Sequence, residues 1–174
     1  MTETLTTLYD IVTHSPEETI AFGRKLASDL HPPRVVLLEG DLGSGKTTLT
    51  KGVAAGLGAA HEEDVTSPSF TLVHEYRESN QNVPSDGAGQ GTTVYHVDLY
   101  RVEGEREVES LGLDELFSPS STVMIEWGDK LRTLPPEPVV RIRLEVAGEN
   151  DRHIVVEKLA GSDDGGFGSF KKPF

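Results

Sequence analysis

The sequence predicts a single α/β domain of three layers, in which helices cover a mainly parallel β-sheet with an antiparallel C-terminal edge. Three observations lead to this prediction. Apolar runs of strand length alternate with segments of helical periodicity, a pattern typical of parallel sheets. A glycine-rich loop at 40–47 joins one such strand directly to a helix. Near the C-terminus, the alternating segment 139–146 pairs well with 152–159 as an antiparallel edge.

The chain's 174 residues are enough for one domain with a substantial core, which we expect to span residues 1–160. Residues 161–174 are rich in glycine, aspartate and serine, and we predict a disordered tail there. The formal net charge of −13 disfavours autonomous binding to nucleic acid, because neutralising phosphates requires a basic surface. The chain has no cysteine, which excludes disulfides and thiolate zinc sites.

The first ten residues lack the basic start and the apolar core of a signal peptide. No apolar run reaches the length of a membrane span. We therefore expect a soluble cytoplasmic protein without membrane association.

The first predicted helix begins with Ser-Pro-Glu-Glu at 15–18, a capping box with proline at the first helical position. Phe22, Leu26 and Leu30 then recur on one face of the helix. The helix ends before the prolines at 32–33, because a residue that precedes proline disfavours helical geometry.

The glycine-rich loop matches G-x-x-x-x-G-K-[ST], the phosphate-cradling motif of P-loop nucleotide hydrolases. An apolar strand at 34–39 precedes the loop and helical spacing begins near Lys46, so the positive end of a helix dipole faces the same site. This context argues against the alternative, a glycine turn that only caps a helix. We expect Lys46 to reach the β- and γ-phosphates of a nucleotide and the Thr47 hydroxyl to coordinate Mg²⁺. The predicted nucleotide-binding residues are Asp41, Leu42, Gly43, Ser44, Gly45, Lys46, Thr47 and Thr48.

Further strands are predicted at 70–76, 94–99 and 122–127, with short helices within 104–117. The intervening segment 77–93 is polar and rich in Gly, Ser, Asn and Gln, which predicts a mobile surface loop between two strands.

Two carboxylates end apolar strands and complete the predicted site. Asp98 ends the strand at 94–99 in the manner of a Walker B aspartate, although a strand-terminal Asp also caps turns. Glu126 ends the run at 123–125, where an isolated glutamate is more often solvated. In a parallel sheet both would point into the ligand crevice at the carboxyl ends of the strands. We therefore assign Lys46, Asp98 and Glu126 to catalysis and Thr47, Asp98 and Glu126 to Mg²⁺. Glu126 is either a metal ligand or the group that polarises water.

For other polar residues, chemistry alone allows two interpretations. The segment 66–70 is an ordinary Ser/Pro turn or a switch whose hydroxyls contact the γ-phosphate. Asp41 binds Mg²⁺ or water, or faces solvent. His96 alternates in phase with Asp98, but a histidine in such a strand is more often a satisfied core residue, and we assign it no catalytic role.

Several segments together resemble one family, the TsaE (YjeE-type) bacterial ATPases of tRNA threonylcarbamoyladenosine biosynthesis. The resemblance covers roughly 13–146, and its ordered motifs are more specific than a P-loop alone. The segments are Gly40–Thr48, Ser67–Val73, Tyr95–Arg101 and Ile125–Trp127.

The resemblance implies a small P-loop α/β fold, Mg²⁺-ATP binding and weak intrinsic ATPase activity. It also implies a role beside the TsaB–TsaD complex, which modifies adenosine 37 of tRNA, with tRNA engaged only indirectly by this chain. The family's nucleotide and magnesium residues fall on Lys46, Thr47, Asp98 and Glu126. The chain departs from the family at Ser69, where the family usually has threonine, and in the length of the loop 77–93.

Two other functions remain as alternatives. A P-loop small-molecule kinase would need an arginine-rich lid, and the sequence before the sheet edge has no suitable arginine cluster. A nucleotide-switched binding module would use ATP as a switch, with turnover incidental. The chain has neither the N-K-x-D motif of GTPases nor the L-S-G-G-Q segment of transporter ATPases.

Overall fold

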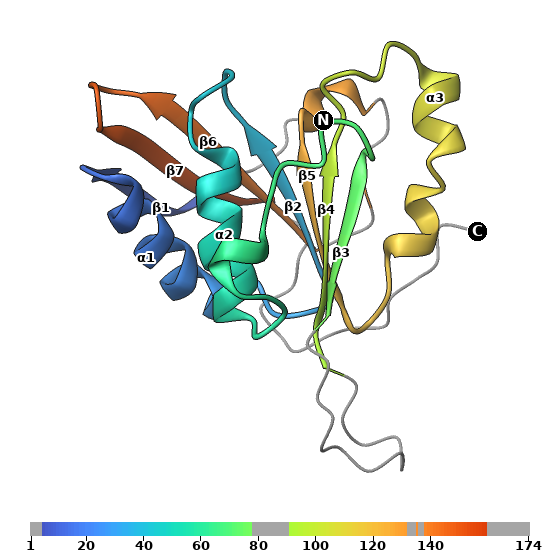
Figure 1. Cartoon of the computed structure of the whole chain (residues 1–174), viewed down its shortest axis with the longest axis horizontal. Coiled ribbons are helices and arrows are strands. Elements are labelled where there is room, and N and C mark those ends of the chain that lie inside the picture. The colour runs from blue at the N-terminus through green and yellow to red at the C-terminus, as the bar shows by residue number, and fades with distance from the viewer. Residues whose placement is uncertain (1–4, 78–90, 132–134, 136–137, 160–174) are drawn as a thin grey trace.

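The computed structural model describes residues 5–77, 91–131, 135 and 138–159. Its centre is a seven-stranded sheet with the order β1-β7-β6-β2-β5-β4-β3 (Figure 1). The strands are β1 Leu5–Thr13, β2 Arg34–Glu39, β3 Val73–Arg77, β4 Thr93–Asp98, β5 Ser121–Glu126, β6 Val139–Val146 and β7 Arg152–Leu159. The α-helices are α1 Pro16–Leu26, α2 Lys46–Gly56 and α3 Glu105–Ser110.

The sheet is parallel in the middle and antiparallel on both sides. β2 pairs in parallel with β5 and β6, and β4 pairs in parallel with β5. The pairs β6–β7, β7–β1 and β4–β3 are antiparallel. The mixed α/β class and the antiparallel C-terminal pair are thus confirmed, but β7 is not the edge of the sheet, because β1 lies outside it.

β1 is the strand that the sequence analysis missed. Much of it is exposed, and its residues from Leu5 to Val12 alternate only weakly between apolar and polar. Its pairing with β7, from Leu5 opposite Leu159 to Thr13 opposite Arg152, joins the two ends of the described chain. Such a pairing leaves no local trace in sequence, since an edge strand buries little of its surface.

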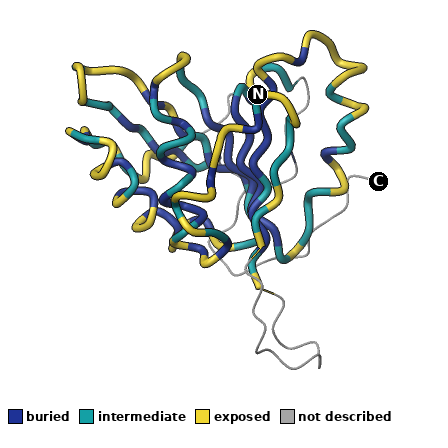
Figure 2. Tube along the Cα trace, viewed as in Figure 1, coloured by how far each residue is buried: buried dark blue, intermediate teal, exposed yellow. Residues whose placement is uncertain are grey.

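Each face of the sheet has its own core, because successive side chains of a strand point to opposite faces. Val36 and Leu38 of β2 pack in the core that α1 and α2 cover. Val35 and Leu37 pack in a second core with residues of the 102–131 segment, which contains α3. The helices therefore form outer layers on the two sides of the sheet (Figure 1), and Figure 2 shows burial concentrated in the central strands.

The predicted cap of α1 is confirmed. The Ser15 hydroxyl accepts a hydrogen bond from the Glu18 amide at 3.1 Å. The Glu18 carboxylate in turn accepts one from the His14 amide at 2.7 Å, one residue before the usual partner of a capping box.

The predicted strand at 70–76 is shorter in the structure, where β3 begins at Val73. Leu72 has a left-handed backbone with φ 66°, and its amide donates to the Pro68 carbonyl at 2.8 Å, so residues 68–72 form a turn. The predicted tail 161–174 lies outside the described residues, as does most of the predicted loop 77–93. The ends of that loop were predicted wrongly, since Arg77 belongs to β3 and Thr93 to β4. Within the described ranges, no helix is both long and apolar enough to cross a bilayer.

Glycines bring α1 and α2 into close contact. A Cβ added at Gly23 would lie 2.5 Å from the Leu49 carbonyl oxygen, and one added at Gly52 would overlap the Ile20 carbonyl oxygen. This close approach sets α1 against the helix that follows the glycine-rich loop.

We expect Gly52→Ala to lower the free energy of unfolding by about 1–3 kcal/mol, because the new methyl group meets backbone that cannot move aside. Helix propensity alone would make alanine more stabilising than glycine inside a helix. A lower free energy of unfolding would therefore be due to the steric overlap. Denaturant unfolding measures the change. Gly104→Ala is the control, since a Cβ there meets nothing within 4 Å. Equal effects of the two substitutions would contradict the close-approach argument.

Candidate active site

The glycine-rich loop, residues 40–47, runs from the end of β2 to the start of α2. A Cβ added at Gly40 would lie 2.5 Å from both the Leu144 carbonyl oxygen and the Ser44 hydroxyl, so only glycine fits there. Gly45 has φ 102° and precedes the first residue of α2, Lys46. The first amides of α2 have no carbonyl partner within the helix and face the loop. The predicted strand–loop–helix arrangement is therefore present, with the geometry of an anion-binding site.

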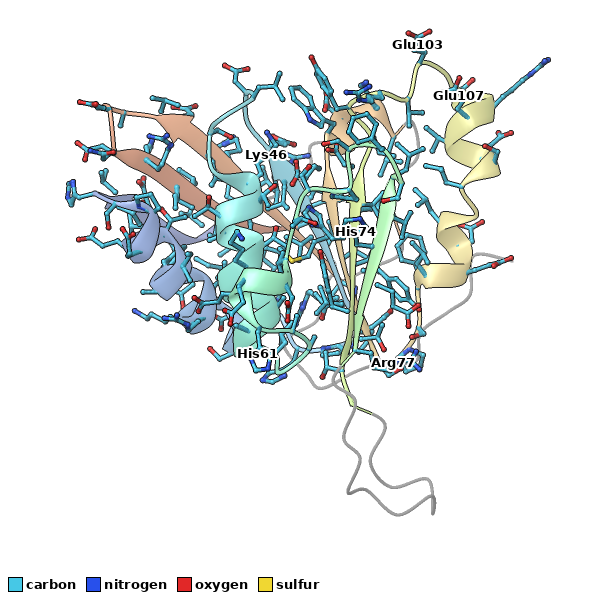
Figure 3. All side chains as sticks on the ribbon, viewed as in Figure 1. Lys46, His61, His74, Arg77, Glu103 and Glu107 are labelled. Atoms are coloured by element: carbon cyan, nitrogen blue, oxygen red, sulfur yellow. The ribbon has the colours of Figure 1, made fainter. Side chains whose placement is uncertain are left out.

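Lys46 is buried inside this loop. Its ammonium group donates to the carbonyls of Gly40 at 2.6 Å and Asp41 at 3.0 Å, and lies 4.8 Å from the ring centroid of Trp127. Burial lowers the pKa of Lys46, while the carboxylates of Glu126, Asp98 and Asp41 act in the opposite direction. Figure 3 shows Lys46 at the end of α2 that lies next to β2.

The parallel register of β4 and β5 sets Asp98 directly opposite Glu126. Both are buried, at 5% and 4% exposure. The Glu126 carboxylate accepts a hydrogen bond from the Thr47 hydroxyl at 3.2 Å, which links β5 to the first turn of α2. Asp98 accepts from the Tyr100 amide at 2.9 Å, so it also caps the turn that follows its strand. The sheet therefore brings together the two predicted carboxylates and Thr47.

The segment 66–72 is connected to Asp98. The Ser67 hydroxyl donates to the Asp98 carboxylate at 3.2 Å and lies 3.0 Å from the Ser69 hydroxyl. Leu72 accepts a hydrogen bond from the Asp98 amide at 3.0 Å through its carbonyl. Phe70, on the same segment, is 84% exposed. A movement of Asp98, or of a group bound to it, would therefore shift the segment 66–72 and its exposed Phe70.

Two non-glycine residues with left-handed backbone flank the carboxylates. Trp127, with φ 61°, directly follows Glu126, and Leu72, with φ 66°, contacts Asp98 through its carbonyl. Residues in such conformations cluster at functional sites, where the surrounding structure holds the strain. The strained turn at Trp127 directs its ring toward Lys46 and to within 5.1 Å of the Tyr100 ring.

One pocket of about 420 Å³ is lined by Lys46, Ser67, Tyr100 and Trp127. Its walls include six predicted nucleotide-binding residues, together with Asp98 and Glu126. The two remaining predicted residues differ: Asp41 is exposed and Ser44 is buried, and neither lines the pocket. The lining residues from the loop and α2 are Leu42, Gly43, Gly45, Lys46, Thr47 and Thr48.

A second wall of the pocket lies outside the residues that the sequence analysis assigned to nucleotide binding. Pro16 and Thr19 of α1 and Asn150 and Arg152 near the start of β7 line it. The Arg152 guanidinium donates to the Gly43 carbonyl at 3.2 Å, across the glycine-rich loop. Pro16 belongs to the predicted capping box at 15–18. No local motif marks Thr19, Asn150 or Arg152, because α1 and the β6–β7 turn meet the loop only through the folded sheet.

A second hollow, of about 760 Å³, lies near the other end of α2. His61 and Arg77 belong to its lining, and both lie far from Lys46 in Figure 3. Its other polar residues are mainly the carboxylates of 62–64 and Glu75. This hollow is larger but has no glycine-rich loop, so we place the candidate active site at Lys46.

Comparisons with known proteins agree with this architecture. The family model named "Threonylcarbamoyl adenosine biosynthesis protein TsaE" matches residues 13–154. The tRNA threonylcarbamoyladenosine biosynthesis protein TsaE of Bacillus subtilis is 40% identical over 142 residues, which are 82% of this chain and 80% of that protein. The protein of the same name from Haemophilus influenzae is 37% identical over 131 residues, 72% of this chain and 75% of that protein.

A solved structure has the same fold. The crystal structure of YdiB from Bacillus subtilis superposes with a TM-score of 0.64 at 32% sequence identity, covering 91% of this chain and 88% of that chain. The family match, the relatives and the shared fold extend over most of the chain. This chain therefore belongs to the TsaE family of tRNA threonylcarbamoyladenosine biosynthesis proteins.

Proposed function

We propose that this protein is a Mg²⁺-dependent ATPase of the P-loop class that supports threonylcarbamoyladenosine modification at position 37 of tRNA. In this proposal it acts with the TsaB–TsaD complex and resets that complex between turnovers. One observation carries the proposal: Lys46, Thr47, Asp98 and Glu126 line a single pocket at the N-terminal end of α2.

The pocket fits a nucleoside triphosphate. The glycine-rich loop supplies the anion nest, and the Lys46 ammonium already binds carbonyl oxygens at the place where phosphate oxygens would compete for it. The rest of the nucleotide would lie against the second wall, which Pro16, Thr19, Asn150 and Arg152 form. We propose that ATP lies across the loop with its phosphates at Lys46.

The residues present also fit Mg²⁺. The Thr47 hydroxyl and the carboxylates of Asp98 and Glu126 are hard oxygen donors, the type that Mg²⁺ binds together with substrate phosphates. When bound, the ion would be held by these three residues and would neutralise negative charge on the phosphates. Glu126 would then be a ligand of the ion or the group that orients the attacking water, and its hydrogen bond with Thr47 supports either role.

The biological assignment is proposed from the family. The names of the relatives place them in tRNA threonylcarbamoyladenosine biosynthesis. A net charge of −13 makes direct binding to tRNA unfavourable, so we propose that a protein complex, TsaB–TsaD, holds the tRNA. The proposed place of action is the cytoplasm.

A nucleotide-switched binding module is the second candidate. It is favoured by the hydrogen bond from Ser67 to Asp98, because the same segment carries the exposed Phe70. In that case nucleotide occupancy would reshape a docking surface, and hydrolysis would be incidental. Separate measurements of binding and turnover distinguish the two candidates.

Lys46→Ala and Glu126→Gln should affect different steps. Lys46→Ala should weaken Mg²⁺-ATP binding by about tenfold or more, because it removes a charged hydrogen-bond donor to phosphate. Glu126→Gln keeps the size of the side chain but loses its charge, so kcat should fall about 100-fold or more while binding persists. Calorimetry and phosphate release measure the two effects.

The controls for this pair are Lys51→Ala, on α2 but outside the pocket lining, and Glu75→Gln, on the edge strand β3. Both should hydrolyse ATP like the unsubstituted protein. Normal turnover by Glu126→Gln would refute its assignment, and tight binding by Lys46→Ala would refute the placement of the phosphates.

Trp127 should report nucleotide binding. It is the chain's single tryptophan, and its ring lies 4.8 Å from the Lys46 ammonium. When phosphate oxygens draw Lys46 toward them, the electric field at the indole changes, and we expect a change in fluorescence intensity or emission maximum. A titration with Mg²⁺-ATP measures it, and Trp127→Phe is the blank. An unchanged spectrum at ATP concentrations that saturate binding by calorimetry would contradict this geometry.

A further inference from the structure

His96 lies in β4, completely buried, two residues before Asp98. Its Nε2 atom is 2.8 Å from Oε1 of Glu126 on the neighbouring strand. An ionised carboxylate only accepts hydrogen bonds, so Nε2 carries the proton and donates it. The same oxygen accepts the hydroxyl of Thr47 at 3.2 Å. Glu126 is thus held from two directions, by the sheet and by α2.

The second nitrogen of His96, Nδ1, has no hydrogen-bond partner in the described part of the chain. Buried polar atoms are generally paired, and one that is unpaired destabilises the fold. A histidine needed only for packing gains nothing from an unpaired nitrogen that an apolar side chain would avoid. The hydrogen bond to Glu126 is therefore the interaction that distinguishes His96 from an apolar residue at this position.

His96 does not line the pocket, whereas Glu126 and Thr47 do. It therefore reaches the contents of the pocket only through Glu126. Glutamate has three rotatable side-chain bonds, and without a fixed partner its carboxylate samples several positions. Partners behind a metal-binding or catalytic carboxylate commonly set its orientation.

We propose that His96 is a positioning residue, which fixes the Glu126 carboxylate against Thr47 by donating from Nε2. This inference rests on the proposed ATPase function for its kinetic consequence, but the position of the carboxylate can be tested without it. His96 acts on the orientation of Glu126 and leaves the glycine-rich loop and Lys46 as they are.

The test compares three substitutions. In His96→Gln the amide nitrogen lies at about the distance of Nε2 and can donate to Glu126. His96→Asn carries the same amide one methylene shorter and falls short of Glu126, and His96→Leu has no donor. We expect Asn and Leu to lower kcat for ATP about 10- to 100-fold, with KM and nucleotide affinity changed less than about threefold. We expect Gln to restore most of the lost rate.

Crystal structures of the Gln and Asn variants provide the second readout. The Glu126 carboxylate should stay beside Thr47 in His96→Gln and leave that position in His96→Asn. Equal loss of kcat in Gln and Asn, or unchanged kcat in Asn and Leu, would overturn the inference. Thermal unfolding of each variant shows whether it is folded under the assay conditions.

The two hypotheses fail in different ways. If the unsubstituted protein binds Mg²⁺-ATP but releases no phosphate, the proposed ATPase function fails. The crystal structures then still decide the role of His96. A carboxylate that remains beside Thr47 in both variants overturns that role whatever the hydrolysis rate.

Discussion

Parallel pairing of β4 with β5 and of β5 with β2 puts three strand ends at one edge of the sheet, and the candidate site depends on this alignment. β2 leads into the glycine-rich loop, while β4 and β5 end in Asp98 and Glu126, directly opposite each other. A shift of one residue in either pairing would turn one carboxylate to the other face of the sheet. The tightly packed α1 and α2 then hold the loop against these strand ends.

The charges in the pocket support the proposal that Mg²⁺ binds there with the nucleotide. Asp98 and Glu126 are buried in a pocket whose lining also includes Lys46, Arg101 and Arg152, and burial lowers the pKa of Lys46. A nucleoside triphosphate would add further negative charge close to both carboxylates. Since unpaired buried charges are strongly unfavourable, a divalent cation between phosphates and carboxylates would make binding favourable. Binding of the cation would then depend on the orientation of Glu126, which the hydrogen bonds with His96 and Thr47 set.

The sequence revealed the parts of the structure that local patterns encode. The cap at Ser15, the loop before Lys46 and the apolar strands that end in Asp98 and Glu126 depend on neighbouring residues, and their positions were predicted. The strand β1 and the pocket wall at Arg152 depend on contacts between distant segments, which one sequence does not display. His96 shows the same limit: its alternation with Asp98 was visible, but its bond to Glu126 appears only when β4 and β5 are paired.

We propose that ATP turnover in this pocket sustains tRNA modification. The first experiment is multiple-turnover threonylcarbamoylation by reconstituted TsaB–TsaD with its carbamoyl-adenylate supply. It compares three reactions: with this protein, without it, and with the Glu126→Gln variant. We expect sustained turnover only with the unsubstituted protein, and a single round or less in the other two reactions. Equal turnover in all three, with Mg²⁺-ATP binding verified, would contradict the claim.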